Sequence, residues 1–169
     1  MISIGSAAPA WTAPAYHKGE FTTLSNEDFK GKWVLIYWWP FDFSGICNSE
    51  ILGFQELESE FAAAGVELVG ASCDTKFAHQ KWFSDESAFP NGQPGHPVLA
   101  DNGHKMTQDF GFYLDAVGCA VRGTALIDPD GVVRSVGANF LNVARDPKDA
   151  LITARAFAKG GACALPARQ

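Results

Sequence analysis

The chain has 169 residues, a length that favours one domain with a sizeable buried core. Hydrophobic residues make up 47% of it and charged residues 19%, which excludes an intrinsically disordered chain. Thirteen Lys and Arg against nineteen Asp and Glu give a formal net charge of −6 without a basic run. We therefore expect neither nucleic acid nor an anionic membrane as the main partner.

The apolar and cysteine patterns indicate a soluble cytoplasmic protein. The longest apolar run, residues 33–41, contains a proline and is far shorter than the roughly 20 residues of a membrane span. The N-terminus lacks the charged-then-apolar plan of a signal peptide. The cysteines form no C-x-x-C pair and show no metal-ligand spacing, so we expect no metal site. In a reducing cytoplasm, any important cysteine is expected to act as a thiol.

The first half of the chain predicts a lead-in, a buried strand and a long helix. Residues 1–30 are interpreted as a lead-in punctuated by Pro9, Pro14 and Gly19, with no strand or helix assigned to it. Residues 33–39 form a continuous apolar run, typical of a central strand buried on both faces. Pro40 ends it, and Ser44 is a candidate N-cap for a helix expected to reach about Gly65. Apolar residues spaced three or four apart share one face of that helix: Cys47, Ile51, Phe54, Leu57 and Phe61.

The second half predicts alternating strands and helices. We expect strands at 66–71 and 97–100, helices at 76–83 and 105–110, and a loop at 84–96.

The chain closes with a hairpin and a last helix. Asp-Pro-Asp-Gly at 128–131 is a turn signal between two apolar segments and predicts the hairpin. Asp146 and Pro147 start the last helix, which ends at Lys159-Gly160. This order predicts a three-layer α/β fold with a central mixed sheet, and it fits a thioredoxin-like fold. We expect residues 1–169 to form a single domain, with 160–169 as a C-terminal tail.

The segment from Pro40 to Cys47, Pro-Phe-Asp-Phe-Ser-Gly-Ile-Cys, places a cysteine in the first turn of a helix after a buried strand. Free backbone N–H groups and the helix dipole favour the nucleophilic thiolate there. Ser44 supplies a hydroxyl that could bond the sulfur or a substrate oxygen. Cys47 also lies on the apolar stripe, however, and buried cysteines are common in cores. Position alone therefore leaves an inert thiol as an equal alternative.

The Pro-x-x-x-Ser-x-x-Cys pattern after an aromatic strand resembles the active-site signature of the peroxiredoxins. Glu50-Ile51 also match that family. Further segments resemble its typical 2-Cys branch, and most of all the bacterial alkyl hydroperoxide reductase C type: Val69–Trp82, Arg122–Arg134, Asn142–Leu151 and Gly161–Pro166. The resemblance covers residues 33–166.

The resemblance implies a role for each matching residue. Cys47 would be the peroxidatic cysteine, Ser44 would orient the peroxide, and Pro40 would shield the sulfur from water. Arg122 would hold thiolate and substrate, although an arginine at a strand start is more commonly part of a surface ion pair. This chain departs from the family in having Ser44 where Thr is commoner, and Asn48-Ser49 after the cysteine instead of Pro-Thr.

The resemblance also implies partners for these residues. Glu50 and Arg145 would position Arg122, with solvent-exposed charges as the equally plausible alternative. Cys163 would be the resolving cysteine, contributed by the partner subunit, unless it is a tail cysteine without a role. Cys73 and Cys119 are interpreted as structural.

As a member of this family the chain would be a thiol-dependent peroxidase that reduces hydrogen peroxide and organic hydroperoxides. A sulfenic acid on Cys47 would give an intersubunit disulfide with Cys163, which an external dithiol reductant reopens. That reductant would be a thioredoxin-like protein or a dedicated flavoprotein reductase. We expect no metal or organic cofactor, and a homodimer or a ring of five dimers. Two alternatives stay open, namely a thioredoxin-like disulfide oxidoreductase, disfavoured because C-x-x-C is absent, and a ring-forming holdase chaperone.

Overall fold

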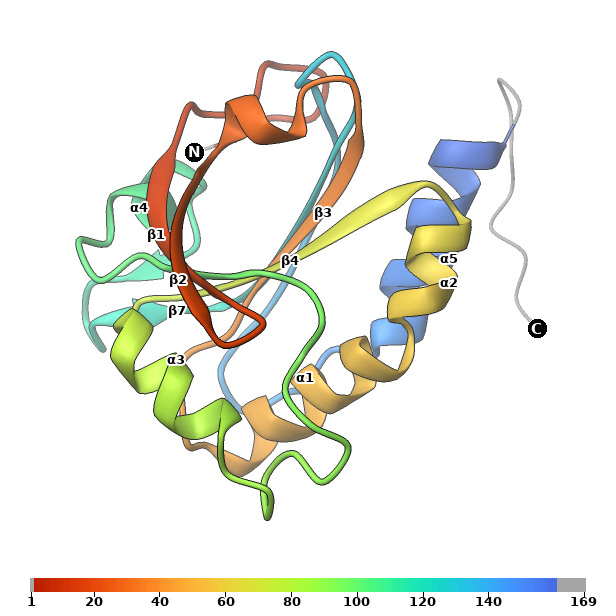
Figure 1. Ribbon diagram of the computed structural model, residues 1–169. Helices are drawn as coiled ribbons and strands as arrows, with labels where there is room; N and C mark the ends of the chain where they lie inside the picture. The colour runs from red at the N-terminus through yellow and green to blue at the C-terminus, as the bar shows by residue number, and fades with distance from the viewer. Residues whose placement is uncertain (1, 161–169) are drawn as a thin grey trace.

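A seven-stranded mixed sheet forms the centre of the computed structural model, which describes residues 2–160 (Figure 1). Its order is β2-β1-β5-β4-β3-β8-β9. The strands are β1 (Thr12–His17), β2 (Glu20–Ser25), β3 (Trp33–Trp38), β4 (Val66–Ser72), β5 (Val98–Ala100), β8 (Arg122–Ile127) and β9 (Val133–Asn139). The β3–β4 and β4–β5 pairs are parallel and the others antiparallel. Strands β6 (Tyr113–Leu114) and β7 (Cys119–Ala120) form a separate small pair, which was not predicted.

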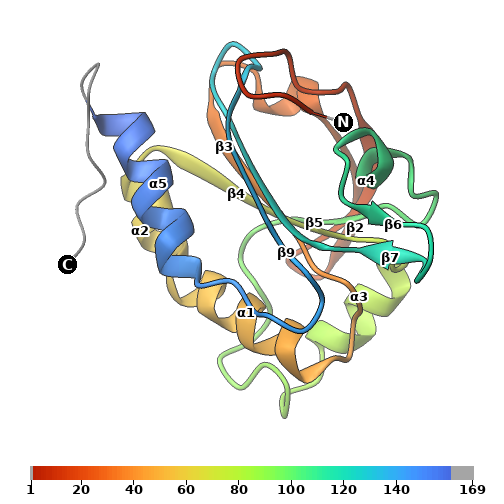
Figure 2. The ribbon, with the colours of Figure 1, turned by 180° about the vertical axis from the view of Figure 1, so that it is seen from behind.

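Helices cover the sheet on both faces. They are α1 (Gly45–Glu56), α2 (Glu58–Ala63), α3 (Lys76–Phe83), α4 (Lys105–Asp109) and α5 (Pro147–Lys159), besides a 3-10 turn at Asn26–Phe29. Figures 1 and 2 show α1, α2 and α5 on one side, and α4 with the β6–β7 pair on the other. None of the helices within residues 2–160 is long and apolar enough to cross a membrane.

Strand β3 separates two hydrophobic cores. Leu35, Tyr37 and Trp39 point into the core beneath α1, α2 and α5, whereas Val34, Ile36 and Trp38 belong to the core on the other face. Because successive side chains of a strand point to opposite faces, an apolar run with no polar position is what a doubly covered strand requires. The three-layer α/β fold with a mixed sheet is thereby confirmed.

The N-terminal lead-in contains two strands that the sequence did not predict. Strands β1 and β2 form an antiparallel hairpin whose two-residue turn, Lys18-Gly19, has positive φ at both positions. This is the turn geometry that suits the twist of a hairpin, although Lys-Gly is a weaker sequence signal for it than Asn-Gly. Pro14 is tolerated in β1 because β5 pairs with that strand only at Ala15 and Tyr16.

The long helix expected to reach Gly65 is also wrong in one respect, since it is interrupted at Leu57. The backbone there has φ −98° and ψ 1°, and α2 starts afresh at Glu58. At this point the Glu58 carboxylate reaches the loop between α3 and β5, where it accepts the backbone N–H groups of Gly95 at 2.7 Å and His96 at 3.1 Å. This long-range contact of Glu58 accompanies the interruption of the helix, and helical periodicity cannot predict it.

Candidate active site

Cys47 lies in the first turn of α1 and is completely buried. Strand β3 delivers the chain to buried Pro40, and a short loop leads to Ser44, the predicted N-cap. The Ser44 carbonyl accepts the N–H of Asn48 at 2.9 Å, while its hydroxyl makes no capping hydrogen bond. The start of α1 therefore holds a buried thiol. One turn earlier lies the Ser44 hydroxyl, which is not used to cap the helix.

Arg122, at the start of β8, brings a positive charge to this thiol. Its Nη1 lies 3.4 Å from Sγ of Cys47 and 2.5 Å from Oε2 of Glu50, and its Nε donates to the Leu141 carbonyl at 2.9 Å. Burial alone would lower the pKa of Arg122, but the hydrogen bond to Cys47 and the charge of Glu50 outweigh it and raise that pKa. The guanidinium is therefore a fixed cation against the sulfur.

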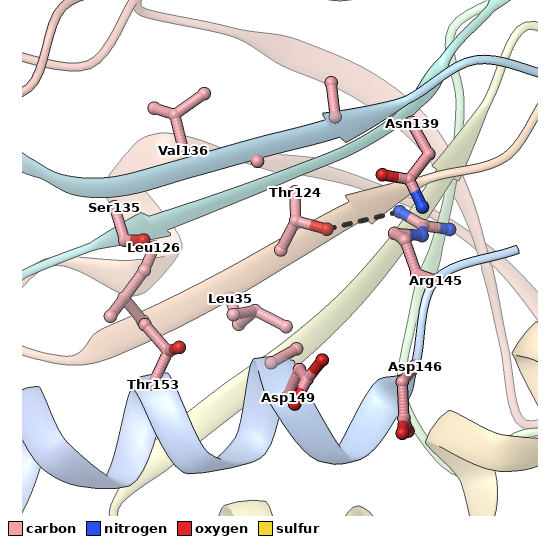
Figure 3. A pocket seen from close by; sticks show the side chains of 13 residues that line it. Leu35, Thr124, Leu126, Ser135, Val136, Asn139, Arg145, Asp146, Asp149 and Thr153 are labelled. Atoms are coloured by element: carbon pink, nitrogen blue, oxygen red, sulfur yellow. Dashed lines mark hydrogen bonds between the residues drawn. The ribbon is translucent and has the colours of Figure 1, made fainter. Parts of the chain in front are cut away.

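Glu50 connects Arg122 to a second arginine, Arg145. Its Oε1 accepts the backbone N–H of Arg145 at 2.7 Å and the Nε of the same residue at 3.0 Å. Arg145 also donates from Nη1 to the Gly123 carbonyl and to Oγ1 of Thr124, the latter at 3.3 Å (Figure 3). Burial lowers the pKa of Arg145, and Glu50 opposes that effect.

The charges of this cluster do not cancel and leave a positive excess. Two guanidinium groups and one carboxylate give one net positive charge next to Cys47. The side chains of Arg122 and Glu50 are 3% and 1% exposed, and that of Arg145 is 9% exposed, so water screens the charge little. A thiolate on Cys47 would balance it.

The structure thus brings together four of the residues singled out in the sequence, Cys47, Glu50, Arg122 and Arg145. The alternatives of an exposed surface ion pair and of solvent-exposed charges do not hold for these burials. Cys163 lies outside the described residues. Within 2–160, His, Cys, Asp and Glu side chains form no group of three or more that could hold a metal ion.

A pocket of about 320 Å³ adjoins the cluster between β8, β9 and α5 (Figure 3). Arg145 and Thr124 line it near Asn139, and Asp149 of α5 faces it from the other side. Cys47 does not line this pocket. The pocket therefore contacts the site through Arg145 and not through Sγ of Cys47.

Sequence reasoning missed one part of this region. Asp42, in the loop before Ser44, is buried and lies 2.6 Å from the buried His79 of α3. The available signal was a carboxylate placed between a buried strand and the helix that carries Cys47.

Comparison with known proteins agrees with the motifs. The model of the AhpC/TSA family matches residues 4–136. Peroxiredoxin-4 of Dictyostelium discoideum is 36% identical over 93% of this chain, which spans 61% of that relative's length. A putative peroxiredoxin in the rubredoxin operon of Clostridium pasteurianum is 33% identical, with 96% of this chain and 93% of the relative covered. The crystal structure of Enterococcus faecalis AhpC superposes with a TM-score of 0.87 at 28% identity, covering 93% of each chain. The chain therefore belongs to the AhpC/TSA family and is a peroxiredoxin, a thiol-dependent peroxidase.

Proposed function

We propose that Cys47 is the peroxidatic cysteine and that its substrates are hydrogen peroxide and organic hydroperoxides. The thiolate attacks one oxygen of the O–O bond, so that an S–O bond forms while the O–O bond breaks. The remaining oxygen leaves as water or an alcohol after taking up a proton, and Cys47 is oxidised to a sulfenic acid. The observation that supports this most is the 3.4 Å contact between the buried Arg122 guanidinium and Sγ of Cys47.

The neighbouring side chains supply binding and charge stabilisation. Arg122 stabilises the thiolate and the charge that develops on the departing oxygen. Ser44 donates a hydrogen bond to the peroxide from a hydroxyl that does not cap the helix. Pro40, which is buried, keeps water from the sulfur. Glu50 and Arg145 hold Arg122 in its orientation.

The reaction is completed by Cys163 of the partner subunit. Its thiol condenses with the Cys47 sulfenic acid, so that an S–S bond forms and water leaves. Because Cys47 is completely buried, the first turn of α1 must open locally before this bond can form. The Gly161–Pro166 motif around Cys163 supports this part of the proposal.

The partners and the location follow from the same chemistry. An external dithiol, either a thioredoxin-like protein or a flavoprotein reductase, reopens the disulfide by thiol exchange. An intersubunit disulfide requires a homodimer, and a ring of five dimers is the larger assembly we propose. The cytoplasm, whose reducing poise suits this cycle, is the proposed location.

Peroxide consumption with a dithiol reductant tests the proposal in the wild type and in three cysteine variants. Cys47→Ser should abolish turnover, and Cys163→Ser should prevent the covalent dimer that one equivalent of peroxide produces on non-reducing gels. Cys73→Ser, the matched control, should leave both unchanged. Turnover in Cys47→Ser, or a covalent dimer in Cys163→Ser, would contradict the assignment.

A further inference from the structure

Three polar side chains from different segments meet beneath the loop that precedes α1. Trp39 follows β3, Asp42 lies in the loop, and His79 belongs to α3. The Trp39 Nε1 donates to Oδ1 of Asp42 at 2.8 Å, and Oδ2 lies 2.6 Å from Nδ1 of His79. The side chains of His79 and Asp42 are 0% and 1% exposed. The carboxylate therefore depends on these two partners instead of water.

The second ring nitrogen of His79 also faces an acceptor. Its Nε2 lies 3.2 Å from the carbonyl oxygen of Leu99 in β5. A carboxylate and a carbonyl can only accept, so a neutral imidazole, with one N–H, could satisfy only one of them. Both contacts become hydrogen bonds when the ring carries two N–H groups. The geometry thus assigns the charged imidazolium to His79.

The surroundings of His79 suit a cation. The ring stacks on Phe83 at 5.9 Å and meets the edge of Trp39 at 5.7 Å. A further charged group lies next to the pair. Asp74, which follows β4, accepts the backbone N–H of Asp42 at 2.9 Å. Burial, and then the charge of Asp42, raise the pKa of Asp74 above its ordinary value.

The loop held by this pair contains a strained residue. Phe43, between Asp42 and the N-cap Ser44, has φ +63°, which is unfavourable for a bulky side chain. Such a conformation persists only where neighbouring contacts impose it. Helix α3 provides two of them, since His79 holds Asp42 and Trp82, one turn later, packs on Phe43 at 5.6 Å.

We propose that Asp42 and His79, with an N–H on both ring nitrogens, are positioning residues of the peroxidase reaction. Their ion pair holds the strained loop in place, and with it the Ser44 hydroxyl and the first turn that carries Cys47. The proposal rests on the proposed role of Cys47. Without the pair the loop relaxes, and the peroxide meets a sulfur and a hydroxyl that are no longer aligned.

The protonation state of His79 can be tested without any activity. Side-chain ¹⁵N NMR at pH 7, on Cys47→Ser as well as the wild type, should show a proton on both ring nitrogens of His79. The His79→Gln variant assigns the signals among the four histidines. An unprotonated ring nitrogen on His79 would overturn the proposal. Because the signal does not depend on Cys47, its outcome is separate from that of the proposed function.

The positioning role is tested by Asp42→Asn. The amide oxygen can still accept from Trp39, but the negative charge on His79 is lost. We expect the second-order rate constant for peroxide to fall by about 10- to 100-fold, with His79 becoming neutral in the NMR spectrum. Asp109→Asn, which alters a carboxylate bonded to Lys105 on the other side of the sheet, should change neither.

Two further variants keep the test decisive. If Asp42→Asn does not fold, as judged by circular dichroism, His79→Gln replaces it with the same expected loss. Asp42→Glu, which restores the charge, should recover part of the rate. A folded Asp42→Asn protein with the wild-type rate constant would overturn the proposal, whereas turnover by Cys47→Ser would overturn only the proposed function.

Discussion

Arg122 Nη1 lies 3.4 Å from Sγ of Cys47, although 75 positions separate the two residues in the chain. The sheet produces this contact. Strand β8 runs antiparallel to β3, with Thr124 opposite Tyr37, so the start of β8 lies beside the end of β3. That end is where the chain leaves the sheet for α1. A helix N-terminus and a strand-borne guanidinium therefore converge on one thiol.

Replacing Arg122 tests whether this contact drives the reaction. In Arg122→Ala the sulfur and the departing oxygen lose their cation, and we expect the rate constant for peroxide to fall by about 10²–10³-fold. Arg122→Lys keeps the charge but cannot reach Cys47, Glu50 and the Leu141 carbonyl together, so its rate should fall in between. Stopped-flow tryptophan fluorescence measures both. Arg155→Lys, at an exposed ion pair, serves as the control; an unchanged rate in Arg122→Ala would contradict the role.

Glu50 is expected to matter for stability as well as for the reaction. In Glu50→Gln two buried guanidinium groups lose the carboxylate between them, and breaking such a pair typically costs about 3–5 kcal/mol. Urea unfolding of the reduced protein at pH 7 should show a loss of that order. Glu60→Gln, which breaks the exposed pair with Arg155, should cost less than about 1 kcal/mol. Equal losses in the two variants would argue against a structural role for the network.

Gly123, next to Arg122, should not tolerate a side chain. A Cβ there would lie 2.6 Å from the Phe112 ring, and the Gly123 carbonyl accepts from Arg145. Gly123→Ala should lower the free energy of unfolding by about 1–3 kcal/mol and slow peroxide reduction by displacing Arg122. Gly137→Ala, opposite Thr124 in β9, is the matched control, because no atom lies within 4 Å of the added Cβ. Unchanged stability of Gly123→Ala by urea unfolding would contradict the clash.

Local signals in the sequence predicted most of the fold. The apolar run of β3, the Ser44 and Asp146 N-caps and the Asp-Pro-Asp-Gly turn each depend on residues close together in the chain. The β1–β2 hairpin escaped prediction because β2 is largely exposed and polar, so it carries no apolar alternation. The interruption at Leu57 depends on Glu58 reaching a loop 37 positions away, which periodicity cannot report.

The residues of the candidate site could be predicted from the sequence where they belong to a recognisable motif. Cys47, Glu50, Arg122 and Arg145 were each identified by a resemblance, yet their burial and mutual distances required the folded sheet. The pairing of Asp42 with His79 spans 37 positions and has no local signature. A buried histidine is more often a satisfied core residue, and only the two acceptors around its ring indicate a charge.

Cys73 should be much less reactive than its partial exposure implies. Its thiol donates to the Thr107 hydroxyl at 3.7 Å, and burial raises its pKa to about 11. The thiolate is the form that reacts, so a raised pKa leaves the group protonated and slow throughout pH 7–9. Cys73 should therefore be alkylated by iodoacetamide roughly 100-fold more slowly than an ordinary cysteine of pKa about 8.5. Mass spectrometry of folded Cys47→Ser measures the rate, with the same protein in urea as the control. Equal rates in the two conditions would show that the fold does not suppress this thiol.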